Sequence, residues 1–122
     1  MEDCLFCKIV NKIEKSLILY EDDVLIVILD AFPDCDGHTL VIPKKHFTDI
    51  NEVDDETLAH MFNIAKKYGN LIMQKLNKKA VTYLINYGDS QVIKHLHLHI
   101  LPNFKRSKAT MKKEEVYKIL KG

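Results

Sequence analysis

Apolar and polar residues follow two different periods along this chain, and these periods predict its strands and helices. A period of two is typical of strands, whose successive side chains point to opposite faces. The run Val24–Leu29 is apolar throughout, which indicates burial on both faces. The acidic turn at residues 21–23 joins the first two strands as a hairpin. Strands are predicted at residues 17–20, 24–29, 38–42, 80–85 and 95–101.

A helical period predicts one long helix, which begins after Asp54 or Asp55 and runs to Asn77. A second apolar stripe in it indicates that more than one side is buried. Gly69 points to a close backbone crossing, either within the domain or at a subunit contact. Shorter helices are predicted at residues 5–13 and 111–120.

The order of these elements predicts an α+β fold, with a mainly antiparallel five-stranded sheet, one long helix and short terminal helices. With 122 residues we expect one domain, residues 1–122, with a core that needs no disulfides. No apolar stretch reaches the length of a membrane span, and the acidic N-terminus lacks the basic region of a signal peptide. We therefore expect a cytoplasmic protein, without a membrane partner, whose three cysteines stay reduced or bind metal.

The net charge of +1 is unevenly distributed. Residues 103–122 contain seven basic and two acidic side chains, a net +5, which leaves −4 for the rest. This tail is either the solvated side of a terminal helix or a surface that steers polyanions. No added DNA-binding domain accompanies it, so we do not expect a nucleic-acid partner.

The segment His95-Leu96-His97-Leu98-His99-Ile100-Leu101 carries the most chemistry. In a strand its three imidazoles would lie on one face, neighbours roughly 6.6 Å apart at a rise of about 3.3 Å per residue. The outer two would lie about 13 Å apart, too far for all three to bind one metal easily. Neutral imidazoles can act on an anionic substrate as nucleophile, hydrogen-bond donor and proton carrier. The alternatives are a polar strand face without function and a two-histidine metal site.

Cys4 and Cys7 have the spacing of half a zinc site, which His46 and His95 could complete. The alternative is a pair of reduced, partly buried thiols. A redox dithiol is disfavoured because no strand precedes the motif. Cys35 has no partner by spacing.

Two further positions could bind a nucleotide. The loop Asn86–Ser90 can offer an amide, a hydroxyl and backbone N–H groups to phosphate, or it is only a turn. Asp30, at the end of an apolar strand, either starts the next turn or accepts hydrogen bonds from a ribose diol. No GxxxxGK loop indicates kinase or ATPase chemistry.

The histidine segment matches the motif His-φ-His-φ-His-φ-φ, with φ apolar, and so resembles the histidine triad (HIT) superfamily. Four other segments resemble the family in the same order: residues 4–9, 20–23, 37–46 and 86–88. The resemblance covers residues 4–104 and is closest to the Hint-like branch, particularly its zinc-carrying bacterial members. It implies a HIT-like fold and a homodimer formed through the long helix and the adjoining strand.

The resemblance also implies an activity. It indicates a nucleotide hydrolase or transferase that acts at the α-phosphate of purine nucleoside phosphoramidates or dinucleoside polyphosphates. His97 would be the nucleophile that forms a nucleotidyl-histidine, and His99 would bond the phosphate or leaving-group oxygen. His38 would lie behind this catalytic row.

The remaining roles follow from the same resemblance. Phe6 and Ile9 match the base pocket, Asp30 the ribose site and Asn86 an amide beside the α-phosphate. Gln91 matches the family's glutamine four residues before the first histidine and is a further candidate for substrate binding. Ser90 is a further candidate for phosphate binding. The ligands of a structural zinc ion would be Cys4, Cys7, His46 and His95.

The chain departs from the family at Val92, where relatives usually carry serine or threonine. Loss of that hydroxyl should weaken a transition-state contact by about 1–3 kcal/mol. Two other functions therefore stay open: a zinc-carrying nucleotide-binding or interaction protein with little activity, and a hydrolase that uses His97 and His99 as metal ligands.

Overall fold

The computed structural model describes residues 4–104 and 108–122. The acidic residues at positions 2 and 3, and Lys105 and Arg106 of the basic tail, lie outside the described residues. Three α-helices, five strands and one short 3₁₀ turn are assigned in the described part. In chain order they are α1 (Leu5–Val10), β1 (Ile18–Glu21), β2 (Leu25–Leu29), β3 (Thr39–Pro43), α2 (Asp55–Lys75), β4 (Val81–Leu84), η1 (Gly88–Ser90), β5 (Leu98–Pro102) and α3 (Lys113–Lys121).

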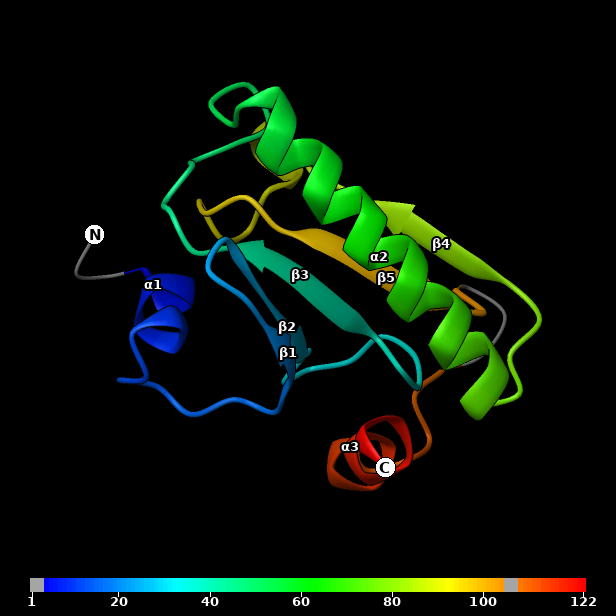
Figure 1. Ribbon diagram of the computed structural model, residues 1–122. Helices are drawn as coiled ribbons and strands as arrows, with labels where there is room; N and C mark the ends of the chain where they lie inside the picture. Colours follow the sequence, from blue (N-terminus) through cyan, green and yellow to red (C-terminus); the bar gives the residue numbers. More distant parts are fainter. Residues whose placement is uncertain (1–3, 105–107) are drawn as a thin grey trace.

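The strands form one open antiparallel sheet in the order β1-β2-β3-β5-β4 (Figure 1). The α+β prediction is therefore confirmed. β5 lies between β3 and β4, and His99 pairs with Leu40 on one side and Leu84 on the other. In the described residues no helix is both long and apolar enough to cross a membrane.

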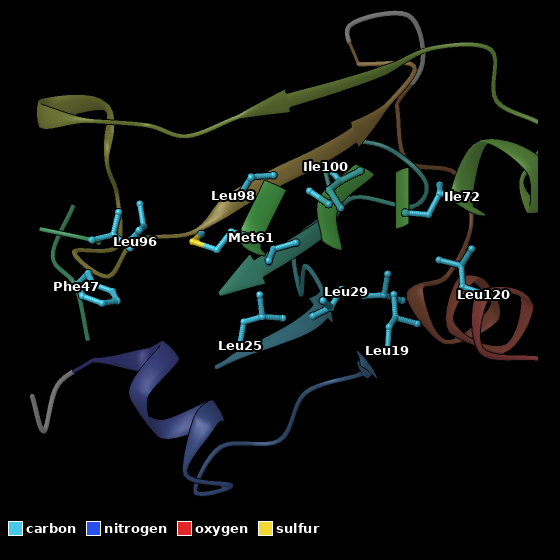
Figure 2. Close-up of a cluster of buried hydrophobic side chains, with 14 of the residues drawn as sticks. Leu19, Leu25, Leu29, Phe47, Met61, Ile72, Leu96, Leu98, Ile100 and Leu120 are labelled. Carbon is cyan, nitrogen blue, oxygen red and sulfur yellow. The ribbon is translucent and has the colours of Figure 1, made fainter. Parts of the chain in front are cut away.

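Both faces of the sheet are covered, as the apolar run of β2 indicates. Its five residues are all buried. Leu25, Val27 and Leu29 belong to the cluster under α2, which Figure 2 shows with Met61, Leu98 and Ile100. Ile26 and Ile28 belong to a second cluster on the opposite face, with Phe6 and Ile9 of α1. The histidine site is built on the face that α1 covers.

Helix α2 lies across the sheet beside β3 and β5 (Figure 1). Asp54 caps it by accepting a hydrogen bond from the N–H of Thr57 at 3.0 Å. The structure places a side chain, not a crossing backbone, against Gly69. A Cβ at this position would meet the hydroxyl end of Tyr83 on β4, so a larger residue would have to displace that ring.

The predicted strand at residues 95–101 is wrong at its beginning, because β5 starts only at Leu98. On the neighbouring strand β3 ends at Pro43, whose nitrogen has no hydrogen to donate to a ladder. The preceding segment is held differently: the N–H of Leu96 donates to the carbonyl of Phe47 at 2.7 Å. Leu96 and Leu98 still join the cluster under α2 (Figure 2), so the predicted alternation of side chains survives without a strand.

The first predicted helix also ends early. Helix α1 stops at Val10, and Lys12 adopts a left-handed backbone with φ 62°, which a continuing helix does not allow. The other predicted elements differ from the observed ones by one or two residues at their ends.

Candidate functional site

The three histidines of the motif lie side by side with Phe6 against them. The ring centroids of His97 and His99 are 4.8 Å apart. The ring of Phe6 meets those of His97 and His95 edge-on, with centroids 4.8 and 5.8 Å away. Helix α1 therefore places an apolar side chain directly against the row, and Ile9 is buried in the same cluster.

The backbone fixes which nitrogen of His97 carries the proton. Its Nδ1 lies 2.8 Å from the carbonyl oxygen of His95, so Nδ1 must donate and Nε2 keeps its lone pair. Among the described residues no fully buried side-chain nitrogen or oxygen lacks a hydrogen-bond partner. The Nε2 atom has no such partner in that part of the chain, so it reaches the surface. Burial lowers the pKa of His97, which keeps the ring neutral at pH 7.

A second chain of contacts fixes the proton of His99. The N–H of Asp34 donates to Nδ1 of His38 at 3.1 Å, so the proton of neutral His38 lies on Nε2. That Nε2 lies 2.9 Å from Nδ1 of His99, which therefore accepts and carries its own proton on Nε2. Burial lowers the pKa of both rings, that of His99 to about 4 with help from its histidine neighbours.

Asp30 stabilises the turn that follows β2 and lies beside His38, at the His99 end of the histidine row. Its Oδ1 accepts a hydrogen bond from the N–H of Phe32 at 2.9 Å, as a turn residue would. Its Oδ2 lies 3.4 Å from Nε2 of His38. Asp30 is also partly exposed, so the carboxylate retains acceptor capacity toward solvent.

The loop residues are divided between the site and its scaffold. The side-chain nitrogen of Asn86 lies 3.5 Å from Nε2 of His99. Gln91 is buried and donates to the carbonyl of Thr48, which ties the loop to the segment after β3. The hydroxyl of Ser90 donates to the carbonyl of Tyr87 at 3.2 Å. Of these three side chains, only that of Asn86 contacts the histidine row, while those of Gln91 and Ser90 bond backbone carbonyls.

At the other end of the row, two thiols and two imidazoles converge. The ligand atoms of Cys4, Cys7, His46 and His95 all lie within 4.8 Å of one another. The Sγ atoms of Cys4 and Cys7 lie 3.3 and 3.5 Å from Nδ1 of His95, and Cys7 Sγ lies 3.2 Å from Nδ1 of His46. Sulfur and nitrogen ligands around tetrahedral zinc are about 3.5 Å apart, given the usual bond lengths. The four residues therefore fit a structural zinc ion.

The ring of His95 is oriented for this role. Its Nε2 lies 2.8 Å from the carbonyl oxygen of Pro43, so Nε2 donates and the Nδ1 lone pair faces the thiols. Burial, assisted by the neighbouring Cys4 thiol, raises the pKa of Cys7 to about 11. A divalent cation would therefore bind by displacing the thiol proton.

A second group, Asp30, His38 and His99, also has its ligand atoms within 4.8 Å. However, Nδ1 of His38 is occupied by the N–H of Asp34, so its Nε2 carries hydrogen and offers no lone pair. With the proton of His38 on Nε2, Asp30, His38 and His99 form a hydrogen-bonded chain and not a metal site. The same reasoning disfavours the hydrolase with His97 and His99 as metal ligands, because His99 offers hydrogen on Nε2.

A cavity of about 440 Å³ lies beside the metal-binding group, and two of the four candidate ligands contribute to its wall. Val92, on its rim, is 92% exposed. The lining residues are Cys4, Leu5, His46, Thr48, Val92, Ile93 and Lys94.

Sequence reasoning missed the groups that set the protonation of the row. They are the carbonyl of Pro43, the carbonyl of His95 and the N–H of Asp34. Backbone groups carry no sequence signature, and two of these three contacts span at least four residues. A buried carboxylate, Asp36, was missed as well, although aspartate inside a loop next to His38 was a visible signal.

Comparison with known proteins supports the geometry. Residues 11–106 match the family model described as HIT domain. A 16.1 kDa HIT-like protein of Mycoplasma pneumoniae is 38% identical over 104 residues, which cover 84% of this chain and 72% of the relative. Adenylylsulfatase HINT3 of Arabidopsis thaliana is 38% identical over 106 residues, 85% of this chain but only 54% of that protein.

A solved structure shows the same fold. The zinc-bound histidine triad family protein of Mycobacterium smegmatis superimposes with a TM-score of 0.90 at 32% identity, covering 98% of this chain and 91% of that chain. Its bound zinc agrees with the fit of the Cys4–Cys7–His46–His95 group, of which Cys4 and Cys7 precede the region matched by the family model. With the family model matching most of its length, this chain belongs to the HIT domain family.

Proposed function

We propose that this protein is a nucleotidyl hydrolase or transferase that cleaves purine nucleoside phosphoramidates or dinucleoside polyphosphates at the α-phosphate. The observation that carries the proposal is the neutral ring of His97, whose Nε2 holds a lone pair because Nδ1 donates to the carbonyl of His95. Such a nitrogen can attack phosphorus without first losing a proton. A covalent nucleotidyl-histidine then divides one difficult displacement into two easier ones.

In the first step, Nε2 of His97 forms a bond to the α-phosphorus while the bond to the leaving group breaks. The leaving group departs with the bonding electron pair, and an amine leaving group takes a proton from solvent. In the second step a water molecule attacks phosphorus, releases its proton to solvent and displaces His97. In both steps Nε2–H of His99 donates a hydrogen bond to the phosphate or the leaving-group oxygen, and the hydrogen bond from His38 keeps that hydrogen on Nε2.

Substrate binding is divided among three groups of side chains. The Nδ2 of Asn86 and the Nε2 of His99 are both donors 3.5 Å apart, so an anionic phosphate oxygen between them would satisfy both. Asp30 would accept the ribose hydroxyls, and Phe6 and Ile9 would contact the base. Gln91 and Ser90 would hold the phosphate loop, Gln91 through its bond to Thr48.

We propose that Cys4, Cys7, His46 and His95 hold one zinc ion, which supplies no chemistry to the reacting phosphate. A closed set of four protein ligands stabilises the fold. Because Cys4 and Cys7 flank Phe6, the ion would fasten α1 against the histidine row. We also propose a homodimer, as the resemblance implies, and a cytoplasmic location, where the thiols stay reduced.

The experiment that tests the function is an acid quench. Adenosine 5′-phosphoramidate, diadenosine polyphosphates and their guanosine analogues are incubated with the protein, quenched in acid and analysed by peptide mass spectrometry. Adenylyl sulfate joins the panel because of the name of the Arabidopsis relative. We expect one nucleotidyl group on His97. Full turnover by His97→Ala would contradict the covalent mechanism.

One observation favours a second function, nucleotide binding with little or no activity. Val92 offers no hydroxyl, and that of Ser90 is directed to Tyr87. Equilibrium binding of AMP without turnover of any phosphoramidate, anhydride or sulfate would support this alternative.

A further inference from the structure

Asp36 is a buried carboxylate that joins the segment before α3 to the loop between β2 and β3. It is only 5% exposed. Its Oδ1 accepts hydrogen bonds from the N–H groups of Thr110 and Met111 at 2.9 and 2.8 Å, and its Oδ2 accepts from the Thr110 hydroxyl at 2.9 Å. Burial alone would raise the pKa of this carboxyl, but these bonds lower it below its usual value. Asp36 is thus an ionised anchor for a segment 74 residues away.

The anchored loop is the one that carries Asp30 and His38. It is closed by backbone bonds from the N–H of Asp30 to the carbonyl of His38 at 3.0 Å, and from the N–H of His38 to the carbonyl of Cys35 at 3.1 Å. Asp36 lies inside the second of these turns. Gly37, next to it, has φ 88°, and a Cβ there would lie 2.9 Å from side-chain carbons of α2 and of the residue that follows it. The loop therefore has little room to adjust if its anchor moves.

The C-terminal segment also lies directly behind the ribose-binding candidate. Asp30 and His38 line a small cavity of about 10 Å³ together with Met111, Lys113 and Val116 of the C-terminal segment. Such a volume holds at most about one water molecule, so these residues lie close together. A shift of the C-terminal segment would therefore change the surroundings of Asp30.

We propose that Asp36 is a positioning residue for ribose recognition, and that it acts by clamping the segment before α3 behind Asp30. The inference rests on the proposed nucleotide function. It assigns to the C-terminal part of the chain a role in substrate selection, although no residue of that part is expected to touch the nucleotide. Without the clamp, Asp30 accepts ribose hydroxyls from a less fixed position, and a substrate without these hydroxyls is unaffected.

The test compares Asp36→Asn with the wild type on two substrates, adenosine 5′-phosphoramidate and its 2′,3′-dideoxy analogue. An amide has the shape of the carboxylate but no charge: its oxygen accepts the two N–H groups more weakly, and its NH₂ group cannot accept the hydroxyl hydrogen of Thr110. We expect the ratio of kcat/KM between the two substrates to fall about tenfold, mainly through KM for the ribonucleotide. Thr110→Val, which removes one of the three bonds, should lower the ratio about threefold, and Thr110→Ser should restore it.

Asp22→Asn is the matched control. Asp22 is a carboxylate with the same kind of partners: it accepts from the N–H groups of Val24 and Leu25 and from the hydroxyl of Tyr20. It also bonds His60 of α2, on a different part of the fold. We expect Asp22→Asn to lower the urea midpoint while the ratio stays at the wild-type value.

The outcomes are distinguishable. An unchanged ratio in both Asp36→Asn and Thr110→Val, with a wild type that prefers the ribonucleotide, would overturn the positioning role and leave the proposed function intact. A wild type that neither binds nor cleaves either nucleotide would overturn both. If Asp36→Asn does not fold, Thr110→Val and Thr110→Ser decide the question. An equal fall in the ratio for Asp22→Asn would mean that any loss of stability has this effect, and would also overturn the role.

Discussion

The two ends of the histidine row use the same side chain in opposite orientations. At one end, His95 donates from Nε2 to the carbonyl of Pro43 and presents a bare Nδ1 to two thiols. At the other end, His99 accepts at Nδ1 from His38 and presents a hydrogen on Nε2 toward Asn86. His97, between them, donates from Nδ1 and leaves Nε2 bare.

In each histidine, the hydrogen-bond partner of one ring nitrogen decides whether the other nitrogen carries a proton or a lone pair. A carbonyl oxygen behind His95 or His97 forces a proton onto the rear nitrogen and frees a lone pair for metal or phosphorus. An imidazole behind His99 has the reverse effect, because the N–H of Asp34 has already fixed its proton. Three equal residues therefore become a candidate ligand, a candidate nucleophile and a candidate hydrogen-bond donor.

The largest effect is expected at His97, the central ring of the row. Replacing His97 by alanine removes the attacking nitrogen and should lower kcat by at least about 10³-fold, while AMP binding changes little. Steady-state kinetics and isothermal titration calorimetry measure the two quantities. His60→Ala is the control, since His60 lies at the Asp22 contact on α2 and should keep full activity. Retention of more than a tenth of the wild-type kcat would remove His97 as the nucleophile.

At the metal-binding end of the row, loss of a ligand should lower the free energy of unfolding. Cys7→Ser should lower the zinc content from about one per chain to none. At zinc concentrations a thousand times Kd it should cost about 4 kcal/mol of the free energy of unfolding, because the ion binds only the folded chain. Elemental analysis and urea unfolding measure both. The control is Cys35→Ala, a buried thiol outside the metal-binding group, which should retain zinc. A wild type purified without zinc, and unaffected by added zinc, would leave Cys4 and Cys7 as ordinary thiols.

The other end should show a pH dependence. The pKa of His99 falls from 6.5 to about 4 through burial, so below pH 6.5 the unfolded chain binds a proton that the folded chain refuses. The stabilisation is complete above pH 6.5 and is lost as the pH falls toward 4. At pH 5 the loss from His99 amounts to about 2 kcal/mol. Urea unfolding at pH 7.5 and pH 5, at fixed zinc concentration, should therefore show a smaller pH effect in His99→Gln. Equal pH effects in both proteins would contradict a half-buried, neutral His99.

The smallest effect is expected beside the row. Val92→Ser supplies, at an exposed position, the hydroxyl that the family resemblance expects there, and should raise kcat/KM for a phosphoramidate about tenfold. Val24→Ser, at a partly exposed valine in the β1–β2 turn, is the control and should not change kcat/KM. A variant no faster than the wild type would place Val92 outside the reach of the substrate.

Most of the fold could be predicted because its signals are local. The apolar run of β2 and the helical spacing of α2 each depend on neighbours in sequence, and both were confirmed. The beginning of β5 could not be predicted from its own residues. It depends on Pro43, which lies on another strand and ends the ladder.

The side chains that form the site could be predicted, but the ring nitrogens that carry their protons could not. Cys4, Cys7, His46 and His95 were expected together from spacing and resemblance, and the structure brings them together. The roles of the rings depend on backbone groups supplied by the fold, and the clamp at Asp36 depends on residues 74 and 75 positions away. Such contacts exist only once the chain is folded.

The most direct measurement of the central claim is a long-range ¹H–¹⁵N correlation spectrum of the histidine rings at pH 7.5, assigned through single His→Gln variants. We expect neutral rings throughout the row, with the proton on Nδ1 of His97 and on Nε2 of His95 and His99. A charged His97, or a neutral His97 with its proton on Nε2, would contradict it, because no lone pair would then face the phosphate.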